Sequence, residues 1–424
     1  MELITALTDK SLLQPDFEGD ETRYRMLETT RAYAFGHLEA LNERDATMRR
    51  LLAYLNGVLD KGLPADRESG LDSDLLRFLS TDLSTVTTVL RWACRSRDVA
   101  DAAQLLRKID TAWSYVGHAQ EGITWVEAVA GMLPVDASRL RARLRTTLAF
   151  LYCNEARTQE GDLAATAAVE SARSCGDAPT LLSALRARTV TLCSLGRHRE
   201  AEDALEEAEA LAGPHPPRFV RRTLLNARGV LASARGEPAA AVEAFRANVE
   251  IARGLGDPYE VMREVAFLAE ALHAAGDTGS AIRETEAALY SAQTTLQMDA
   301  PAIVLANLAG YMLALDDVER GAQTATRALK TAMRPSGTQT ELAAASLQLA
   351  LACALSGDFA SAARLFGFSV AAKDPIGSDT SHTEALTTER LKGILRDRFG
   401  DATLQSLAAE GFHFTEGRVS ELMP

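Results

Sequence analysis

Six polar side chains are placed so that they could bind a ligand together. They are Arg143, Arg186, Asn226, Arg263, Glu270 and His273, and each lies three, six, ten or thirteen residues before a position typical of a tight turn. An arginine guanidinium donates in a planar fork that matches carboxylate and phosphate groups. The pattern therefore predicts a site for an anionic or amphipathic effector, or for a peptide. The alternative is that these arginines are solvated charges that balance an acidic chain.

Residues for catalysis or metal binding form no recognisable motif in the sequence. The seven histidines show no HExxH spacing, and the five cysteines show no CxxC spacing. There is also no GxSxG nucleophile motif and no GxxxxGK[ST] phosphate loop. The sequence therefore predicts binding without catalysis: no enzyme, no catalytic residue, no metal site and no cofactor in this chain.

The turn positions recur at a fixed period. They are separated by 40, 40, 40, 40 and 41 residues, and they are Ala156, Gly196, Gly236, Gly276, Asp316 and Gly357. A small residue follows each turn after five positions: Gly161, Ala201, Ala241, Ala281, Gly321 and Ala362. Seven positions before each turn lies another residue of this kind: Ala149, Thr189, Gly229, Ala269, Ala309 and Ala350. A fixed period with small residues at fixed offsets predicts stacked helical hairpins, each longer than the roughly 34 residues of a tetratricopeptide (TPR) repeat.

The beginning of the chain follows a different pattern. An apolar run at Leu3–Leu13, a polar loop, a short run at Arg23–Leu27 and an amphipathic stretch at Glu28–Asn42 predict a helix, two strands and a helix. The strings LTDKSLL at 7–13 and RYRMLETTRAYA at 23–34 closely resemble the winged-helix end of the STAND/NB-ARC regulatory ATPases. Within that family the resemblance is to the MalT-like and AfsR-like bacterial transcriptional regulators.

The resemblance covers nearly the whole chain, including the tryptophan-bearing segment at 82–133 and the segment at 362–424 that resembles the family's C-terminal cap. It implies that the winged helix packs on an ATPase domain as part of a nucleotide switch. Because this chain starts inside the winged helix, we expect that domain upstream of Met1. The resemblance also implies self-association in the activated state.

Composition limits the class of protein further. The net charge of −13 argues against direct nucleic-acid binding, and the aromatic content of only 6% favours helices over sheets. No run of 18 apolar residues and no signal peptide is visible, and the scattered cysteines indicate reduced thiols. We therefore expect a cytoplasmic protein that has no membrane partner.

We predict an all-α fold: a TPR-like α-solenoid, which is a right-handed superhelix of ~40-residue repeats. The expected domains are a winged-helix remnant with its following helix at 1–45, a helical linker segment at 46–117, the repeat array at 118–370 and a helical cap at 371–424. In such an array the first helix of each repeat lines the concave groove. The six polar residues would lie there, in a groove whose second half is apolar.

Two functions remain open. The first is a ligand- or partner-binding sensor module of a STAND-type transcriptional regulator. The alternative is a freestanding TPR adaptor or scaffold protein with no role in transcription. An adaptor has no need for part of an ATPase switch, so the segment at 1–34 favours the first. The reading frame upstream of Met1 would discriminate between them.

Overall fold

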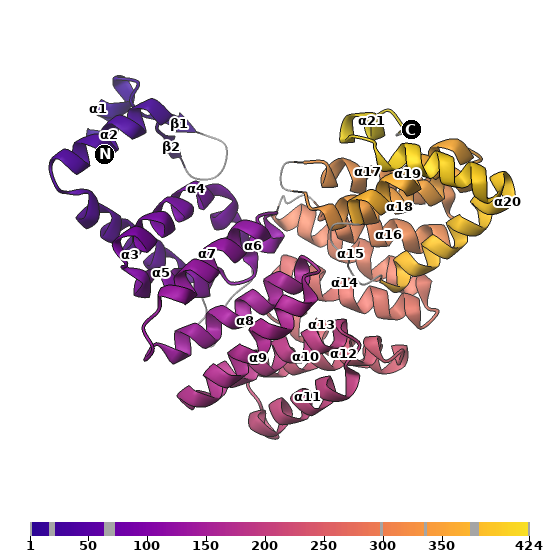
Figure 1. Cartoon of the computed structure of the whole chain (residues 1–424), viewed down its shortest axis with the longest axis horizontal. Coiled ribbons are helices and arrows are strands. Elements are labelled where there is room, and N and C mark those ends of the chain that lie inside the picture. The colour runs from indigo at the N-terminus through magenta and orange to yellow at the C-terminus, as the bar shows by residue number, and fades with distance from the viewer. Residues whose placement is uncertain are drawn as a thin grey trace.

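Helices make up most of the computed structural model, which describes residues 2–16, 22–62, 73–296, 300–334, 337–373 and 381–422. The described residues form 21 helices and one two-stranded sheet. The N-terminal and C-terminal helices form the two arms of a V, and α8 to α13 lie at its base (Figure 1). The all-α prediction is confirmed. No described helix has the length and apolar character that crossing a membrane requires.

The N-terminal segment consists of two helices and a hairpin. Its elements are α1 (Glu2–Asp9), β1 (Gln14–Asp16), β2 (Arg23–Arg25) and α2 (Glu28–Ala40). The strands pair antiparallel, with Gln14 opposite Arg25. No described side chain before Met48 is buried. This segment therefore has the helix–hairpin–helix order that the sequence predicted, but it packs little against the rest of the chain.

A helical segment with its own core follows. Its helices are α3 (Arg44–Gly62), α4 (Ser73–Ser96), α5 (Val99–Ile109), α6 (Ala112–Tyr115) and α7 (Ala119–Met132). Trp113 is fully buried, and Trp92 donates through Nε1 to Asp45 Oδ1 at 2.9 Å. Both indoles are part of the packing of this segment.

Six helical hairpins form the repeat array. They comprise α8 (Ser138–Asn154) with α9 (Thr158–Cys175), α10 (Ala178–Ser194) with α11 (His198–Ala212), α12 (Arg218–Ala234) with α13 (Pro238–Arg253), α14 (Pro258–Ala274) with α15 (Thr278–Leu296), α16 (Ala302–Ala314) with α17 (Val318–Ala332), and α18 (Gln339–Leu355) with α19 (Phe359–Lys373). First helices of successive hairpins contact each other, as α8 does with α10 and α16 with α18. We call these first helices the inner layer.

All six predicted turn positions have the left-handed backbone conformation. Their φ angles are 56° at Ala156, 70° at Gly196, 73° at Gly236, 85° at Gly276, 61° at Asp316 and 91° at Gly357. The small residues at the fixed offsets are buried where two helices cross. At Gly229, for example, a Cβ atom would lie 2.4 Å from the ring of Phe245. Each period of the sequence therefore corresponds to one packed helical hairpin.

We expect Ala156→Gly to stabilise the array slightly. Relief of the left-handed strain is worth about 1–2 kcal/mol, which exceeds the entropic cost of about 0.4–1 kcal/mol for a glycine in the unfolded chain. The net gain of about 0.5 kcal/mol can be measured by urea denaturation. Gly236→Ala is the matched control, and it should lower the stability because its φ is 73°. Equal effects of the two changes would contradict this account.

The chain ends in α20 (His382–Phe412) and α21 (Glu416–Ser420). Gly400, with φ 71°, is not helical and divides α20 into two parts that meet at a kink. The first part lies against α14, α16 and α18 of the inner layer, and α20 also packs extensively on α19. Residues 374–380, at the start of the expected cap, lie outside the described residues. The end of the array is thus covered by a helix that also follows the inner layer.

Candidate functional site

A cluster of charged side chains lies on three consecutive helices of the inner layer. Arg186 comes from α10, Arg222 and Asn226 from α12, and Arg263 and Glu264 from α14. Glu264 is almost fully buried, while the side chain of Arg263 remains 22% exposed. We call these residues, together with Glu260 and Asn248, the inner cluster.

The two glutamates of the inner cluster hold Arg222 and Arg263. Arg222 donates to Glu260 Oε2 at 3.1 Å and to Glu264 Oε1 at 3.0 Å. Arg263 NH2 lies 2.7 Å from the same Oε1 atom of Glu264, and Asn248 donates to Oε2 at 2.7 Å. Burial lowers the pKa of Arg263, but the acidic groups around it, with Glu264 first, together outweigh burial, so that the pKa is raised. Glu264 is therefore the centre of the cluster, with both carboxylate oxygens used.

Arg186 has a different environment. Its guanidinium lies over the ring of Phe150, 4.4 Å from the centroid, and its NH2 donates to Asn226 Oδ1 at 3.4 Å. It forms no ion pair with any described residue. Burial lowers the pKa of Arg186, and the positive charge of Arg263 lowers it further. Arg186 is thus a partly desolvated cation next to a second cation.

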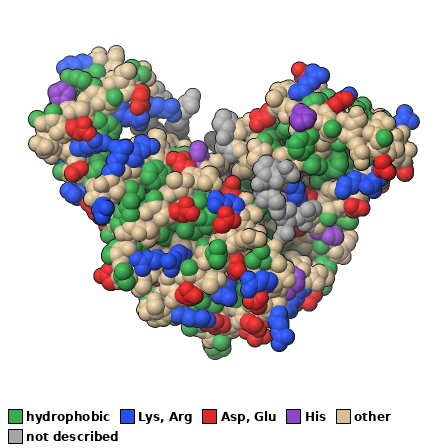
Figure 2. All heavy atoms as spheres, viewed as in Figure 1, with side chains coloured by type: hydrophobic (Ala, Val, Ile, Leu, Met, Phe, Trp, Pro, Cys, Tyr) green, Lys and Arg blue, Asp and Glu red, His purple; other side chains and the backbone are tan. Residues whose placement is uncertain are grey.

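Two tyrosines from different parts of the chain complete this region. Tyr115 of α6 and Tyr259 of α14 meet edge to face, with ring centroids 6.1 Å apart. Tyr115 is 42% exposed, and its phenol interacts electrostatically with both Arg186 and Arg263. The helical segment before the array therefore lies against the inner cluster, in agreement with the packing of α4 on α14. The space-filling view shows a hollow between the two arms and acidic and basic side chains interspersed over this face (Figure 2).

Arg143 lies apart from the inner cluster. It is buried on α8, and its NH2 is 3.9 Å from Asp177 Oδ2. That carboxylate also accepts from the hydroxyl and the backbone N–H of Thr180, at the beginning of α10. Arg143 thus contributes to the joint between the first two hairpins.

Glu270 and His273 contact the cap rather than the other predicted site residues. Glu270 accepts from the backbone N–H of Thr383 at 2.9 Å and from its hydroxyl at 2.6 Å. The hydroxyl of Tyr311 donates to Glu270 Oε2 at 3.0 Å. The ring of His273 lies 5.5 Å from that of His382, and its Nδ1 is 2.9 Å from Thr278 Oγ1. These two residues connect α14 to the first turn of α20.

The apolar half of the predicted groove is not open. At Gly310, a Cβ atom would lie 2.4 Å from the Cγ2 atom of Thr383. Arg390 of α20 donates to the carbonyl of Leu313 at 2.7 Å, and Thr387 donates to Gln348 Oε1 at 3.1 Å. The apolar surface predicted at these positions is covered by α20. The part of the inner layer around the inner cluster is therefore the better candidate for a ligand.

We expect acid to weaken the contact between α14 and α20. Burial lowers the pKa of His273 below 6.5; the charge of Glu270 opposes this shift, and His382 adds to it. The folded state therefore favours neutral His273, so its stabilisation is present above pH 6.5 and is lost as the pH falls through the lowered pKa. Thermal unfolding of His273→Gln should show a smaller loss of stability between pH 7 and about 5 than the unchanged protein. The exposed His413 provides the control, because His413→Gln should leave the pH profile unchanged.

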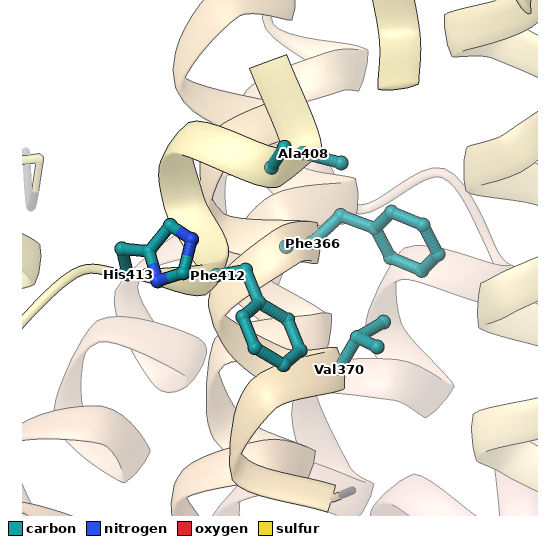
Figure 3. Close-up of a pocket in the computed structure, with 7 residues that line it drawn as sticks. Phe366, Val370, Ala408, Phe412 and His413 are labelled. Carbon is teal, nitrogen blue, oxygen red and sulfur yellow. The ribbon is translucent and has the colours of Figure 1, made fainter. Parts of the chain in front are cut away.

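An apolar cavity lies at the other end of the molecule, between α19 and the second part of α20. Its volume is about 340 Å³, and the side chains of Phe366, Val370 and Phe412 border it together with Ala408 and His413 (Figure 3). Phe412 and Val370 are 40% and 42% exposed. The cavity lies where α19 and α20 cross at their glycines, Gly367 and Gly411.

The structure brings together three of the six residues selected from the sequence: Arg186, Asn226 and Arg263. Arg222, Glu260, Glu264 and Asn248 were missed. Arg222 lies fourteen residues before its turn, one position away from the offset that selected Arg263. The Glu260 and Glu264 pair at helical spacing beside Arg263 was a signal that could have identified the carboxylates. Thr383 and Tyr115 carried no such signal.

Sequence comparisons relate the chain to bacterial regulators. Three curated proteins, one from Mycobacterium bovis and two from strains of Mycobacterium tuberculosis, are each described as "Putative HTH-type transcriptional regulator". Each is 30% identical over 267 residues, which cover 61% of this chain and 29% of the relative. No protein-family model matches. The chain is a distant homologue of these proteins and spans less than a third of their length.

Solved structures with similar helical arrangements have low sequence identity. A tetratricopeptide repeat protein from Parabacteroides merdae is 16% identical, covering 65% of this chain and 99% of its own, with a TM-score of 0.41. Aspartyl phosphate phosphatase F from Bacillus subtilis is 9% identical, covering 76% and 94%, with a TM-score of 0.43. A STAND protein with a tetratricopeptide repeat sensor from Pyrococcus horikoshii is 12% identical, covering 96% and 60%, with a TM-score of 0.35.

Proposed function

We propose that this chain is the sensor module of a STAND-type transcriptional regulator of the MalT-like or AfsR-like kind. It acts by binding a ligand or partner on the inner layer of the repeat array, without catalysis. The observation that carries the proposal is the inner cluster, in which Arg186 is held on an aromatic ring with no carboxylate partner among the described residues. Distant homology to the mycobacterial proteins supports a role in regulation.

The position of the inner cluster suits a sensor. It joins α10, α12 and α14, and Tyr115 reaches it from the helical segment that precedes the array. A ligand bound there would contact both the array and that segment. A ligand shifts a conformational equilibrium when its contacts differ between the two conformations. A ligand that contacts two segments makes such contacts if the segments move relative to each other. Binding in the array would in this way change how the helical segment of α3 to α7 is held.

The N-terminal segment supports the assignment to a larger switch protein. Its exposed apolar side chains include Leu3 at 79%, Tyr33 at 70% and Leu41 at 63%. A segment that has no buried side chain among its described residues and exposes several large apolar ones is typical of an element that packs on another domain. The proposed role is that of a winged helix packed on a nucleotide-binding domain, as the resemblance of residues 7–34 implies.

Transcript profiling of the source organism tests this function. We expect deletion of the gene to change the transcripts of a defined set of genes, and the full-length gene to restore them on complementation. Reading the frame upstream of the Met1 codon for GxxxxGK[ST] tests the link to an ATPase domain. An unchanged transcript profile, with a stop codon close upstream, would overturn the proposal in favour of a freestanding adaptor.

A further inference from the structure

The positive charge at the inner cluster is not balanced by the carboxylates in contact with it. Arg186, Arg222 and Arg263 face two glutamates, Glu260 and Glu264. Asp110 interacts with Arg186 at longer range, but its Oδ1 accepts from Thr147 at 2.6 Å and it forms no ion pair with Arg186. Among the described residues, the ion pairs of the cluster therefore leave one cation, Arg186, without a carboxylate in contact with it.

Two guanidinium nitrogens of the cluster also lack acceptors. The Nε atoms of Arg186 and Arg263 are buried and have no hydrogen-bond partner among the described residues. A buried donor without an acceptor typically costs about 1–3 kcal/mol. Such a cost at two neighbouring arginines is more typical of a binding site than of a core built only for stability. An oxyanion between them would satisfy donors of both side chains.

We propose that the inner cluster binds the carboxylate of a small aromatic or otherwise apolar monoanion, between Arg186 and Arg263. This inference rests on the proposed sensor function and names the chemical class of its effector. Asn226 fixes one end of the Arg186 fork, Phe150 supports its face, and Glu264 fixes Arg263. The apolar part of the ligand would lie against Tyr115, whose half-exposed side chain interacts electrostatically with both arginines.

The charge of the cluster selects the class of anion. A monoanion matches the one arginine of the cluster that has no ion-pair partner among the described residues, whereas a phosphate dianion would leave a partly buried negative charge next to Glu260 and Glu264. Burying an unbalanced charge is unfavourable even where hydrogen bonds are available. The planar fork of Arg186 also matches a planar carboxylate. A carboxylate should therefore bind more tightly than inorganic phosphate.

The test uses benzoate, benzamide and inorganic phosphate as probes on the whole 424-residue chain. Benzoate and benzamide have nearly the same shape, but only benzoate carries the charge. We expect isothermal titration calorimetry to give a dissociation constant for benzoate at least tenfold lower than for benzamide or phosphate. Equal binding of benzoate and benzamide, or no binding of benzoate, would overturn the proposal. If phosphate bound more tightly than benzoate, the carboxylate assignment would be wrong and the ligand group would be a phosphate.

Two variants of Arg186 and one control variant locate the binding site. Arg186→Gln should weaken benzoate binding at least tenfold, and Arg186→Lys should weaken it less because the charge is retained without the fork. Arg228→Gln, on the exposed face of α12 in a pair with Glu209, should bind benzoate as the unchanged chain does. Equal losses in all three variants would overturn the location. Because this binding is measured on the purified chain, its outcome is independent of the transcript profile that tests the regulatory function.

Discussion

Replacing Glu264 with glutamine is expected to lower the free energy of unfolding by about 3 kcal/mol or more. Glu264 is only 4% exposed; its two oxygens accept from Arg222 and Asn248, and it forms an ion pair with Arg263. Glutamine has nearly the same size, so the change removes the charge without creating a cavity. Arg222 and Arg263 would then face Glu260 alone, and removing one partner of a buried ion pair leaves a buried charge uncompensated.

Urea denaturation followed by circular dichroism measures this loss. Glu250→Gln is the matched control, because Glu250 also pairs with an arginine, at 2.7 Å, but its side chain is 64% exposed. Exposed pairs of this kind contribute about 0–1 kcal/mol, so the control should unfold almost as the unchanged protein does. If Glu264→Gln were as stable as Glu250→Gln, the inner cluster would not be a buried electrostatic unit.

The array could be predicted from the sequence because its determinants are local. Each hairpin repeats the same left-handed turn and the same small residues at helix crossings. The turn at Ala156 followed the period although alanine is not a typical residue for a positive φ, here 56°. Since each repeat contacts mainly its neighbours, a period in sequence is directly a period in space. The division into domains at residues 45, 117 and 370 stays a prediction.

The candidate site could be predicted only in part, for a related reason. The offsets placed Arg186, Asn226 and Arg263 on one layer, because that placement depends on position within a repeat. They did not show that Glu270 accepts from Thr383, which is 113 residues further along the chain. Nor did they show that Tyr115 reaches the arginines from before the array. Such contacts depend on the curvature of the whole superhelix, which no single repeat encodes.

The second large effect is expected at the crossing of α19 and α20. In α19, a Cβ atom at Gly367 would lie 1.9 Å from the carbonyl oxygen of Ala408, and one at Gly411 would lie 1.8 Å from that of Arg364. These neighbours are backbone atoms of helices, so a side-chain rotation cannot relieve the clash. We expect Gly367→Ala to push the two helices apart, at a cost of about 3 kcal/mol, the upper end of the usual range for overpacking. The same displacement would open the apolar cavity beside Phe412.

Limited proteolysis and thermal unfolding test this effect together. Separation of the helices should accelerate cleavage near Gly400, where the backbone leaves the helical conformation. Gly393→Ala is the matched control in the same helix, because nothing lies within 4 Å of the added Cβ atom. Alanine there should stabilise α20 by about 0.5–1 kcal/mol. If Gly367→Ala lowers the stability and Gly393→Ala raises it, then close contact between the helices, rather than helix propensity, holds the second part of α20 on the array. A stabilising effect at both would mean that the crossing is wider than the structure has it.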